Sequence, residues 1–388
     1  MKVALIGRGF SSSWGGAERV AVNLTRAFVR AGHEVDIYAE RIDEAEAILE
    51  GVTITKVPTL RVVSSLRHLS FNKNVRRLLQ GKDHDVVFGL CQFYPLDIYR
   101  ASGGVHDHWL RLSYPNPLQR FFKYLISPVH AVICALERRI MRRENHTFII
   151  TNSNLVKGHM QSYFALSDDE VRVVYNGVDH ETFNSSVKEA RAKVRAELAL
   201  DDGELVLLFV SNNWKRKGLD TILRAMAKLQ GKKALKLVVV GRAKEREKKK
   251  FIRLQGSLGL KSDAVIFAGV RNDVASLYGA ADVFVLPTKY DPCSNACLEA
   301  MATGLPVITT NDNGAAEFID AGKNGYVLKS WDASDELAVY IDSLSDANLR
   351  AKMGEGAVKA MSGRTWEVTM RETLALLEAV LDEKRDRC

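Results

Sequence analysis

The residues best suited to bind a ligand lie in one short segment, from Tyr290 to Glu299. Two carboxylates, Asp291 and Glu299, stand near its two ends. Because a carboxylate accepts hydrogen bonds, Glu299 can hold a ribose diol and Asp291 can hold sugar hydroxyls. Glu299 follows Leu298 in an apolar stretch, where an unpaired carboxylate would be costly to bury. An alternative is that Asp291 only caps a helix whose first residue is Pro292.

A short helix is expected inside this segment, because the sequence then reaches Gly304 and Pro306, residue types at which helices commonly end. The first N–H groups of a helix have no intrahelical partner and carry a partial positive charge. They can therefore bind an anion. We expect these donors at Ser294, Asn295 and Ala296.

A second candidate is the loop 211–218, in which Lys215, Arg216 and Lys217 follow an apolar run. Negative charge builds on a diphosphate leaving group as a glycosidic bond breaks, and fixed cations stabilise that charge. We therefore assign Arg216 and Lys217 to catalysis and to binding of the diphosphate. The alternative is a basic loop that is only solvated.

The first loop of the chain, residues 7–18, is rich in glycine. A dinucleotide-binding fingerprint would need glycine at position 12, where Ser12 stands, and this disfavours an NAD site. Gly15 and Gly16 directly precede a predicted helix, and they offer bare backbone N–H groups to a phosphate or a sugar. The alternative is that these glycines only turn the chain.

A sheet must position these segments, and the sequence predicts two sheets. Short runs rich in Val and Ile alternate with longer helical patterns, as in parallel βαβ units. A chain of 388 residues suits two domains. We expect doubly wound α/β domains on either side of a central cleft, with ligands at the carboxyl ends of the strands. The expected strands are 3–7, 34–39, 52–57, 85–90, 147–152 and 171–175, then 205–211, 235–241, 264–269, 283–287, 306–310 and 325–328.

The break between the domains is expected near the turn sequence Asn176–Gly177. We expect a first domain over residues 1–180 and a second over 181–364. The segment 365–388 contains an amphipathic helix, which we expect to pack back on the first domain.

Composition excludes several classes of protein. No apolar run reaches the roughly 18 to 20 residues of a membrane span, and the apolar start is too short for a signal peptide, so we expect a cytoplasmic protein. Five cysteines without a C-x-x-C pair argue against disulfides and zinc. The net charge of +8 suits an anionic membrane surface or a phosphorylated acceptor. Nucleic acid is not expected, because no nucleic-acid-binding module is found.

Together these motifs resemble the retaining glycosyltransferases of family 4, which have the GT-B fold of two Rossmann-like domains. The resemblance covers nearly the whole chain and is most specific in the acidic pair before the sequence Ala-Met-Ala-Thr-Gly-Leu-Pro-Val. It implies that Asp291 contacts the donor sugar, Glu299 contacts the ribose, and Arg216 and Lys217 hold the diphosphate. It implies no metal and no cofactor. The family usually has Glu at the first acid, and the shorter Asp291 leaves the identity of the donor sugar open.

The resemblance also implies a histidine near the donor sugar. His106 is the candidate, in the segment Asp97–Trp109 that we expect to be a loop after a strand. Asp107 and His108 are its substitutes, and a merely polar surface is the alternative. A metal is not expected here, because two ligands from three successive residues rarely share an ion.

Residues 110–143 combine seven Arg or Lys with one acid, Glu137, and with interleaved aromatic residues. This composition suits an anionic lipid interface, although the segment is too polar to span a membrane. It resembles the membrane-facing region of the lipopolysaccharide core glucosyltransferases. A solvated basic face over a buried helix is the alternative.

The resemblance implies a retaining, metal-independent enzyme. It would move a hexose from a nucleoside-diphosphate sugar, expected to be a UDP-sugar, to a hydroxyl of a lipid-linked or lipopolysaccharide core acceptor. The first domain would bind the acceptor and the second the donor. Two alternatives stay open: a nucleotide-sugar epimerase of the same fold, and a non-catalytic nucleotide-sugar-binding protein.

Overall fold

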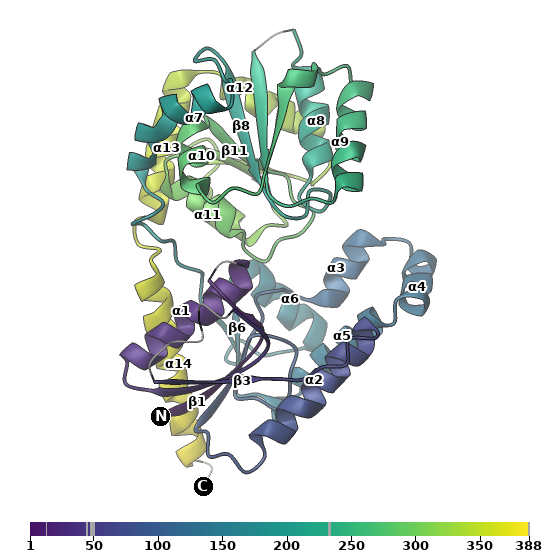
Figure 1. Cartoon of the computed structure of the whole chain (residues 1–388), viewed down its shortest axis with the longest axis vertical. Coiled ribbons are helices and arrows are strands. Elements are labelled where there is room, and N and C mark those ends of the chain that lie inside the picture. Colours follow the sequence, from purple (N-terminus) through teal and green to yellow (C-terminus); the bar gives the residue numbers. More distant parts are fainter. Residues whose placement is uncertain (13, 44–45, 47–50, 232–233, 387–388) are drawn as a thin grey trace. The chain divides into compact units, whose positions relative to one another are not determined.

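The computed structural model describes residues 1–12, 14–43, 46, 51–231 and 234–386, which form two α/β units (Figure 1). The N-terminal unit consists of Met1–Tyr175 together with Trp366–Cys388, and the C-terminal unit consists of Asn176–Thr365. The first boundary therefore lies at the Asn176–Gly177 turn. The second boundary lies at Trp366, one residue after the predicted start of the C-terminal segment at residue 365.

The N-terminal unit is built on a seven-stranded sheet whose strand pairs are parallel, in the order β3-β2-β1-β4-β5-β6-β7. The six runs expected in this half are all strands. The strands are β1 (Lys2–Phe10), β2 (Glu34–Ile42), β3 (Val52–Lys56), β4 (Val86–Gly89), β5 (Ile98–Arg100), β6 (Phe148–Thr151) and β7 (Val171–Val173).

The sequence prediction misses β5, because it places the whole segment Asp97–Trp109 in a loop. Ile98–Arg100 pairs with β4 on one side and with β6 on the other, and its three residues are buried. Three residues are too few to show a periodic pattern. The same segment also contains the start of a helix, and His106 is the first residue of this helix rather than part of a loop.

Both faces of this sheet are buried. Val3 and Leu5 of β1 belong to one core cluster, whereas Ala4 and Ile6 belong to another. Alternate residues of a strand point to opposite faces, so helices must cover both sides. The helices are α1 (Gly16–Arg30), α2 (Ser64–Leu79), α3 (His106–Ser113), α4 (Pro117–Ile126), α5 (Val129–Ile140), α6 (Asn154–Phe164) and α14 (Trp366–Asp386).

Helix α14 completes one face of the N-terminal sheet, although it is the last element of the chain (Figure 1). Leu377 and Val380 are fully buried in the same cluster as Val3. The hydroxyl of Thr369 donates a hydrogen bond of 2.8 Å to the carbonyl of Tyr175. The tail helix is thus part of the core of the N-terminal unit.

The C-terminal unit is built on a six-stranded parallel sheet in the order β10-β9-β8-β11-β12-β13, with all six strands where the sequence predicts them. The strands are β8 (Leu205–Val210), β9 (Leu235–Val240), β10 (Val265–Gly269), β11 (Val283–Leu286), β12 (Val307–Thr310) and β13 (Gly325–Leu328). The helices are α7 (Arg191–Glu197), α8 (Leu219–Lys228), α9 (Glu245–Ser257), α10 (Val274–Ala280), α11 (Asn295–Ala302), α12 (Ser334–Ser343) and α13 (Ala347–Met361).

Each sheet has a point at which the strand order reverses. In the C-terminal sheet this point lies between β8 and β11, and in the N-terminal sheet it lies between β1 and β4. Ligands of open parallel sheets bind beyond the carboxyl ends of the strands at such points. The loop 211–218 follows β8 and the loop 287–294 follows β11. The two loops that carry the predicted cations and the first predicted acid therefore meet where a ligand is expected.

The described cysteines, Cys91, Cys134, Cys293 and Cys297, are buried free thiols, and Cys388 lies outside the described residues. Within the described ranges, no helix is both long enough and apolar enough to cross a membrane.

Candidate active site

The predicted site residues fall into two groups, one in each unit. Gly15, Gly16 and His106 belong to the N-terminal unit. The remaining residues belong to the C-terminal unit, where they occupy the two loops after β8 and β11 and the first two turns of α11. These residues are Arg216, Lys217, Asp291, Ser294, Asn295, Ala296 and Glu299.

The loop after β8 is fixed against the loop after β11. Gly218 has φ +80°, and a Cβ at this position would lie 2.1 Å from the carbonyl oxygen of Pro287. Only glycine can therefore approach so closely. The backbone N–H of Lys289 donates to the carbonyl of Arg216 at 2.8 Å. These contacts hold Arg216 and Lys217 at the reversal point of the sheet.

Lys217 and Asp291 form an ion pair between the two loops, and both side chains are largely buried. Burial, together with the neighbouring Arg216, lowers the pKa of Lys217 to about 7. Asp291 does not cap a helix, since α11 begins at Asn295 with Ser294 as its N-cap. The capping alternative for Asp291 is therefore wrong.

Arg216 lies beside this pair without a carboxylate of its own. Its Nε is buried and has no hydrogen-bond partner, and none of the described residues forms an ion pair with it. Burial lowers the pKa of Arg216, although a guanidinium remains charged at neutral pH. Arg216 is half-buried, and a partly desolvated cation without a counter-ion is costly to maintain. An anionic ligand would remove that cost.

The start of α11 supplies backbone donors. No side chain caps this helix and its first turn holds no acid. The sequence predicts a free N–H at Ser294, but this group donates to Oδ1 of Asn313 at 3.1 Å, so that part of the prediction is wrong. The N–H of Cys297 donates to the carbonyl of Ser294. None of the described residues accepts a hydrogen bond from the N–H group of Asn295 or of Ala296. These two donors can bind an anion.

Glu299 lies in the second turn of α11, and its side chain is held in place from α10. The hydroxyl of Tyr278 lies 3.1 Å from Oε2 of Glu299 and 3.2 Å from the carbonyl of Ala296. Tyr278 is fully buried. A carboxylate has several acceptor lone pairs, so Glu299 can also accept hydrogen bonds from a diol.

Gly15 and Gly16 stand at the start of α1, with Gly15 as the N-cap and no side-chain cap. Gly15 has an extended backbone, so its conformation alone does not require glycine. A Cβ on Gly15 would lie 3.0 Å from Oε2 of Glu18. The glycine leaves room for Glu18 in the first turn of the helix.

His106 begins α3 and is held by α5. Its Nε2 lies 3.0 Å from Nδ1 of His130, and its backbone N–H donates to Oε2 of Glu137 at 3.1 Å. Burial, together with the neighbouring His130, lowers the pKa of His106 to about 4. The imidazole is therefore neutral at pH 7. Burial raises the pKa of Glu137 to about 8, so this carboxyl group is largely protonated at pH 7.

The two substitutes for His106 are engaged with neighbours. Asp107 accepts from Arg111 at 3.0 Å and from the hydroxyl of Tyr124 at 3.0 Å. The ring of His108 stacks on His159 with centroids 3.8 Å apart. Among the described residues, no group of three or more His, Cys, Asp or Glu side chains is arranged to hold a metal ion.

Sequence reasoning missed two supporting residues, Asn313 and Tyr278. The side chain of Asn313 accepts from the N–H groups of Ser294 and Ala315, and it donates to the hydroxyl of Thr309. The sequence Asn-Asp-Asn-Gly after β12 is a turn signal that could have indicated it. Tyr278 has no comparable signal, because it acts on a residue 21 positions away.

Two parallel Rossmann-like sheets, with charged loops at a reversal of strand order, define a two-domain α/β enzyme of the nucleotide-binding type. Two family models match the chain. Glycosyltransferase Family 4 matches residues 14–182, and Glycosyl transferases group 1 matches residues 190–360. Together they span nearly all of both units, and the chain belongs to the GT-B glycosyltransferases.

Individual relatives agree with this class. Uncharacterized glycosyltransferase MJ1607 of Methanocaldococcus jannaschii is 26% identical over 374 residues, covering 92% of this chain and 93% of the relative. Lipopolysaccharide glucosyltransferase WaaG of Escherichia coli is 24% identical over 351 residues, covering 89% and 90%. A crystal structure of WaaG has a TM-score of 0.82 at 22% identity and covers 98% of both chains. The resemblance to lipopolysaccharide core glucosyltransferases is confirmed.

HepE of Anabaena is a further structural neighbour. Its complex with UDP-glucose has a TM-score of 0.74 at 19% identity, covering 98% of this chain and 100% of HepE. HepE has also been solved with UDP and with UDP and glucose. At this identity the likeness supports the GT-B fold.

Proposed function

We propose that this glycosyltransferase moves a hexose from a UDP-sugar to a hydroxyl of a lipid-linked or lipopolysaccharide core acceptor, with retention of the anomeric configuration. The observation that carries the donor side is Arg216, a half-buried guanidinium whose Nε is buried without a hydrogen-bond partner and which has no counter-ion among the described residues. It lies on a loop that is fixed to the loop of Asp291.

The diphosphate of the donor would occupy the space beside Arg216 and the start of α11. Arg216 and Lys217, with the N–H groups of Asn295 and Ala296, would stabilise the negative charge that develops as the sugar leaves. Glu299 would accept hydrogen bonds from the ribose, and Asp291 from the sugar. Because these protein groups supply the stabilising charge, no metal is assigned to the step.

The choice of UDP is supported by HepE, which has been solved with UDP-glucose. The choice of acceptor is supported by WaaG, whose name describes a lipopolysaccharide glucosyltransferase. Retention is supported by the resemblance to the retaining enzymes of family 4. We assign no carboxylate nucleophile, since both acids of the C-terminal unit have roles in holding the donor.

The acceptor would bind to the N-terminal unit, between the start of α1 at Gly15 and Gly16 and the start of α3 at His106. One ring nitrogen of the neutral His106 faces His130, and the other can form a hydrogen bond with a hydroxyl of a sugar. The ring lies against His130, and the buried Glu137 accepts a hydrogen bond from the backbone N–H of His106.

An anionic membrane surface would carry the acceptor to the enzyme, and α4 is the element suited to meet it. None of the residues of α4 is buried, and Leu118, Phe121, Phe122, Leu125 and Ile126 are exposed. Arg120 and Lys123 lie on the same helix. Apolar side chains beside cations are what an interfacial helix needs to bind anionic lipid.

Incubation of the purified protein with UDP-glucose, UDP-galactose and UDP-N-acetylglucosamine, with and without a lipopolysaccharide core acceptor, tests the proposal. We expect UDP release that depends on the acceptor, and an α-linked product by NMR. An isomerised donor in the absence of acceptor would indicate an epimerase instead, and binding without turnover would contradict transfer.

A further inference from the structure

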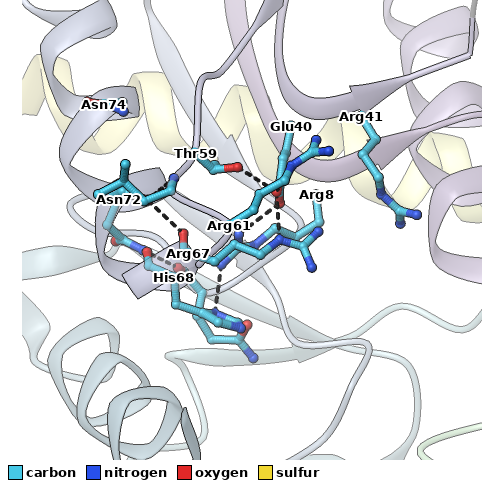
Figure 2. Close-up of polar contacts among 12 residues, drawn as sticks. Arg8, Glu40, Arg41, Thr59, Arg61, Arg67, His68, Asn72 and Asn74 are labelled. Carbon is cyan, nitrogen blue, oxygen red and sulfur yellow. Dashed lines mark hydrogen bonds and ion pairs between the residues drawn. The ribbon is translucent and has the colours of Figure 1, made fainter. Parts of the chain in front are cut away.

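A cluster of arginines surrounds one buried carboxylate at the carboxyl edge of the N-terminal sheet (Figure 2). Arg8 lies near the end of β1 and Glu40 near the end of β2. Arg61 follows β3, and Arg67 lies in the first turn of α2. We refer to Arg8, Arg61 and Arg67 around Glu40 as the arginine cluster. Ligands of parallel sheets bind at this edge.

Glu40 is fully buried and its two oxygens are already satisfied. Oε1 accepts from Nε of Arg67 at 2.6 Å and from the hydroxyl of Thr59 at 2.7 Å, and Oε2 accepts from Nη1 of Arg8 at 3.1 Å. Burial alone would raise the pKa of Glu40, but the hydrogen bonds from Arg67, Thr59 and Arg8 outweigh it and hold the pKa at about 2. Glu40 therefore carries one negative charge at any pH at which the enzyme works.

The neighbouring histidine adds a hydrogen-bond donor but no charge. Nη2 of Arg8 lies 2.7 Å from Nδ1 of His68. An arginine can only donate, so Nδ1 of His68 is the acceptor and the proton lies on Nε2. Burial, with the charges of Arg8 and Arg67, lowers the pKa of His68 to about 4. Three guanidinium groups against one carboxylate thus leave an excess of two positive charges.

Several donors of the arginine cluster are not used within the described residues. Arg61 is 63% exposed, and its one contact is an Nε that lies 3.8 Å from Glu40. The contacts of Arg67 with Glu40 run through Nε, which leaves its two Nη groups available. Nε of Arg8 is buried and has no partner. In addition, α2 has no side-chain cap and no acid in its first turn.

A purely structural ion pair does not explain this arrangement. One arginine satisfies one carboxylate, and each further buried or half-buried cation adds desolvation and repulsion. Arg61 adds charge without a hydrogen bond to Glu40. Arg41, on the same strand as Glu40, contacts Glu18. Figure 2 draws no contact between Arg41 and the arginine cluster. The excess charge is therefore local to Arg8, Arg61 and Arg67.

We infer that the arginine cluster binds a phosphomonoester group of the acceptor. Planar guanidinium groups bind phosphate through paired hydrogen bonds, and the excess of two charges matches a dianion better than a single carboxylate. Glu40 then orients the arginines before the acceptor arrives. The inference rests on the proposed function, since it assigns an acceptor to the N-terminal unit.

The test compares two double variants that each remove two positive charges. Arg61→Ala with Arg67→Ala changes the arginine cluster. Lys73→Ala with Arg77→Ala changes two exposed cations farther along α2. Binding of inorganic phosphate and of glucose 6-phosphate is measured by calorimetry at fixed ionic strength, with glucose and acetate for comparison. UDP binding is measured on the same samples.

We expect the wild type and the Lys73/Arg77 variant to bind both phosphates, but neither glucose nor acetate. The Arg61/Arg67 variant should bind the two phosphates at least about tenfold more weakly than the wild type, and its affinity for UDP should be unchanged. Arg61→Ala alone, which loses no hydrogen bond, should show part of the loss even if the double variant is unstable. Equal phosphate binding in all variants, equal binding of acetate, or no phosphate binding by the wild type would overturn the inference. If the wild type does not bind UDP, this result would instead contradict the proposed function.

Discussion

The carboxyl edges of the two sheets arrange their charges differently. In the C-terminal unit, Lys217 is paired one to one with Asp291, and Arg216 beside them is left without an acid. In the N-terminal unit, three arginines share the single carboxylate of Glu40. Both edges are positive, but at the first edge the unpaired charge is a single half-buried guanidinium, whereas at the second edge the charge is spread over three partly exposed arginines.

This difference suits two kinds of ligand. A single cation held on a fixed loop stabilises charge that develops during a reaction, because it need not reorganise. A partly exposed group of arginines around an orienting carboxylate suits an anion that is bound but not transformed. We therefore expect changes at the C-terminal edge to affect the donor and the chemical step, and changes in the N-terminal unit to affect the acceptor and the membrane.

Replacement of Arg216 by Ala should have the largest effect. Loss of one group that stabilises the leaving diphosphate should lower kcat by about 10²–10³-fold, with a smaller change in the KM of the acceptor. Lys215→Ala is the matched control, because Lys215 is the exposed neighbour on the same loop. Equal losses of activity in the two variants would show that the loop acts through its overall charge. That result would contradict the assignment of a single stabilising cation to the C-terminal edge.

Replacement of Glu299 by Ala should come second. The ribose would lose its acceptor, and we expect about 10- to 100-fold weaker UDP binding by calorimetry, with acceptor binding unchanged. Tyr278→Phe, which removes only the hydroxyl that holds Glu299, should give a smaller loss in the same direction. Unchanged UDP affinity in Glu299→Ala would remove this residue from the donor site.

Changes on α4 should affect membranes and leave the donor site intact. Phe122, Leu125 and Ile126 are exposed, so their replacement by Ser should not unfold the protein. We expect at least about tenfold weaker co-sedimentation with anionic liposomes and the same UDP affinity. Serine at Ile252, Val270 and Val339, which are exposed apolar residues of the C-terminal unit, is the control. Equal liposome binding by both triple variants would reject α4 as the membrane contact.

The smallest effect concerns the stability of the N-terminal unit. Burial raises the pKa of Glu137 from 4.5 to about 8, so between these values the folded state binds a proton that the unfolded state has released. The free energy of unfolding should therefore fall as the pH rises through this window. The interval from pH 6.5 to 8 separates this effect from the histidines, whose lowered pKa values act below 6.5.

Denaturant unfolding of the wild type and of Glu137→Gln at pH 6.5 and pH 8 measures this effect. The decrease between the two pH values should be smaller in the variant, because Gln cannot release a proton. UDP binding should not differ. An identical decrease in both proteins would show that Glu137 is already ionised at pH 6.5.

The class of fold could be predicted from the sequence alone, and the residues proposed for the donor site could be selected from it. Twelve apolar runs indicate parallel strands in both halves, and all of them are strands in the structure. The C-terminal residues could be proposed from the sequence because they lie in two short contiguous segments, each directly after a strand. Residues that are close together in such a segment are also close together in space. Arg216 and Lys217 are adjacent, and the segment from Asp291 to Glu299 is a single loop and helix start.

Other features depend on contacts between segments that are distant in the sequence. The three-residue strand β5 is formed by pairing on both sides, which no local pattern records. Tyr278 reaches Glu299, and Lys217 reaches Asp291, across 21 and 74 positions. Arg8, Glu40 and Arg67 come from three separate elements, and their charges are brought together by parallel strands that end at one edge. Hydrophobic periodicity is local and survives in the sequence, whereas the partner of a charged side chain depends on the register and order of the sheet, which the sequence shows only indirectly.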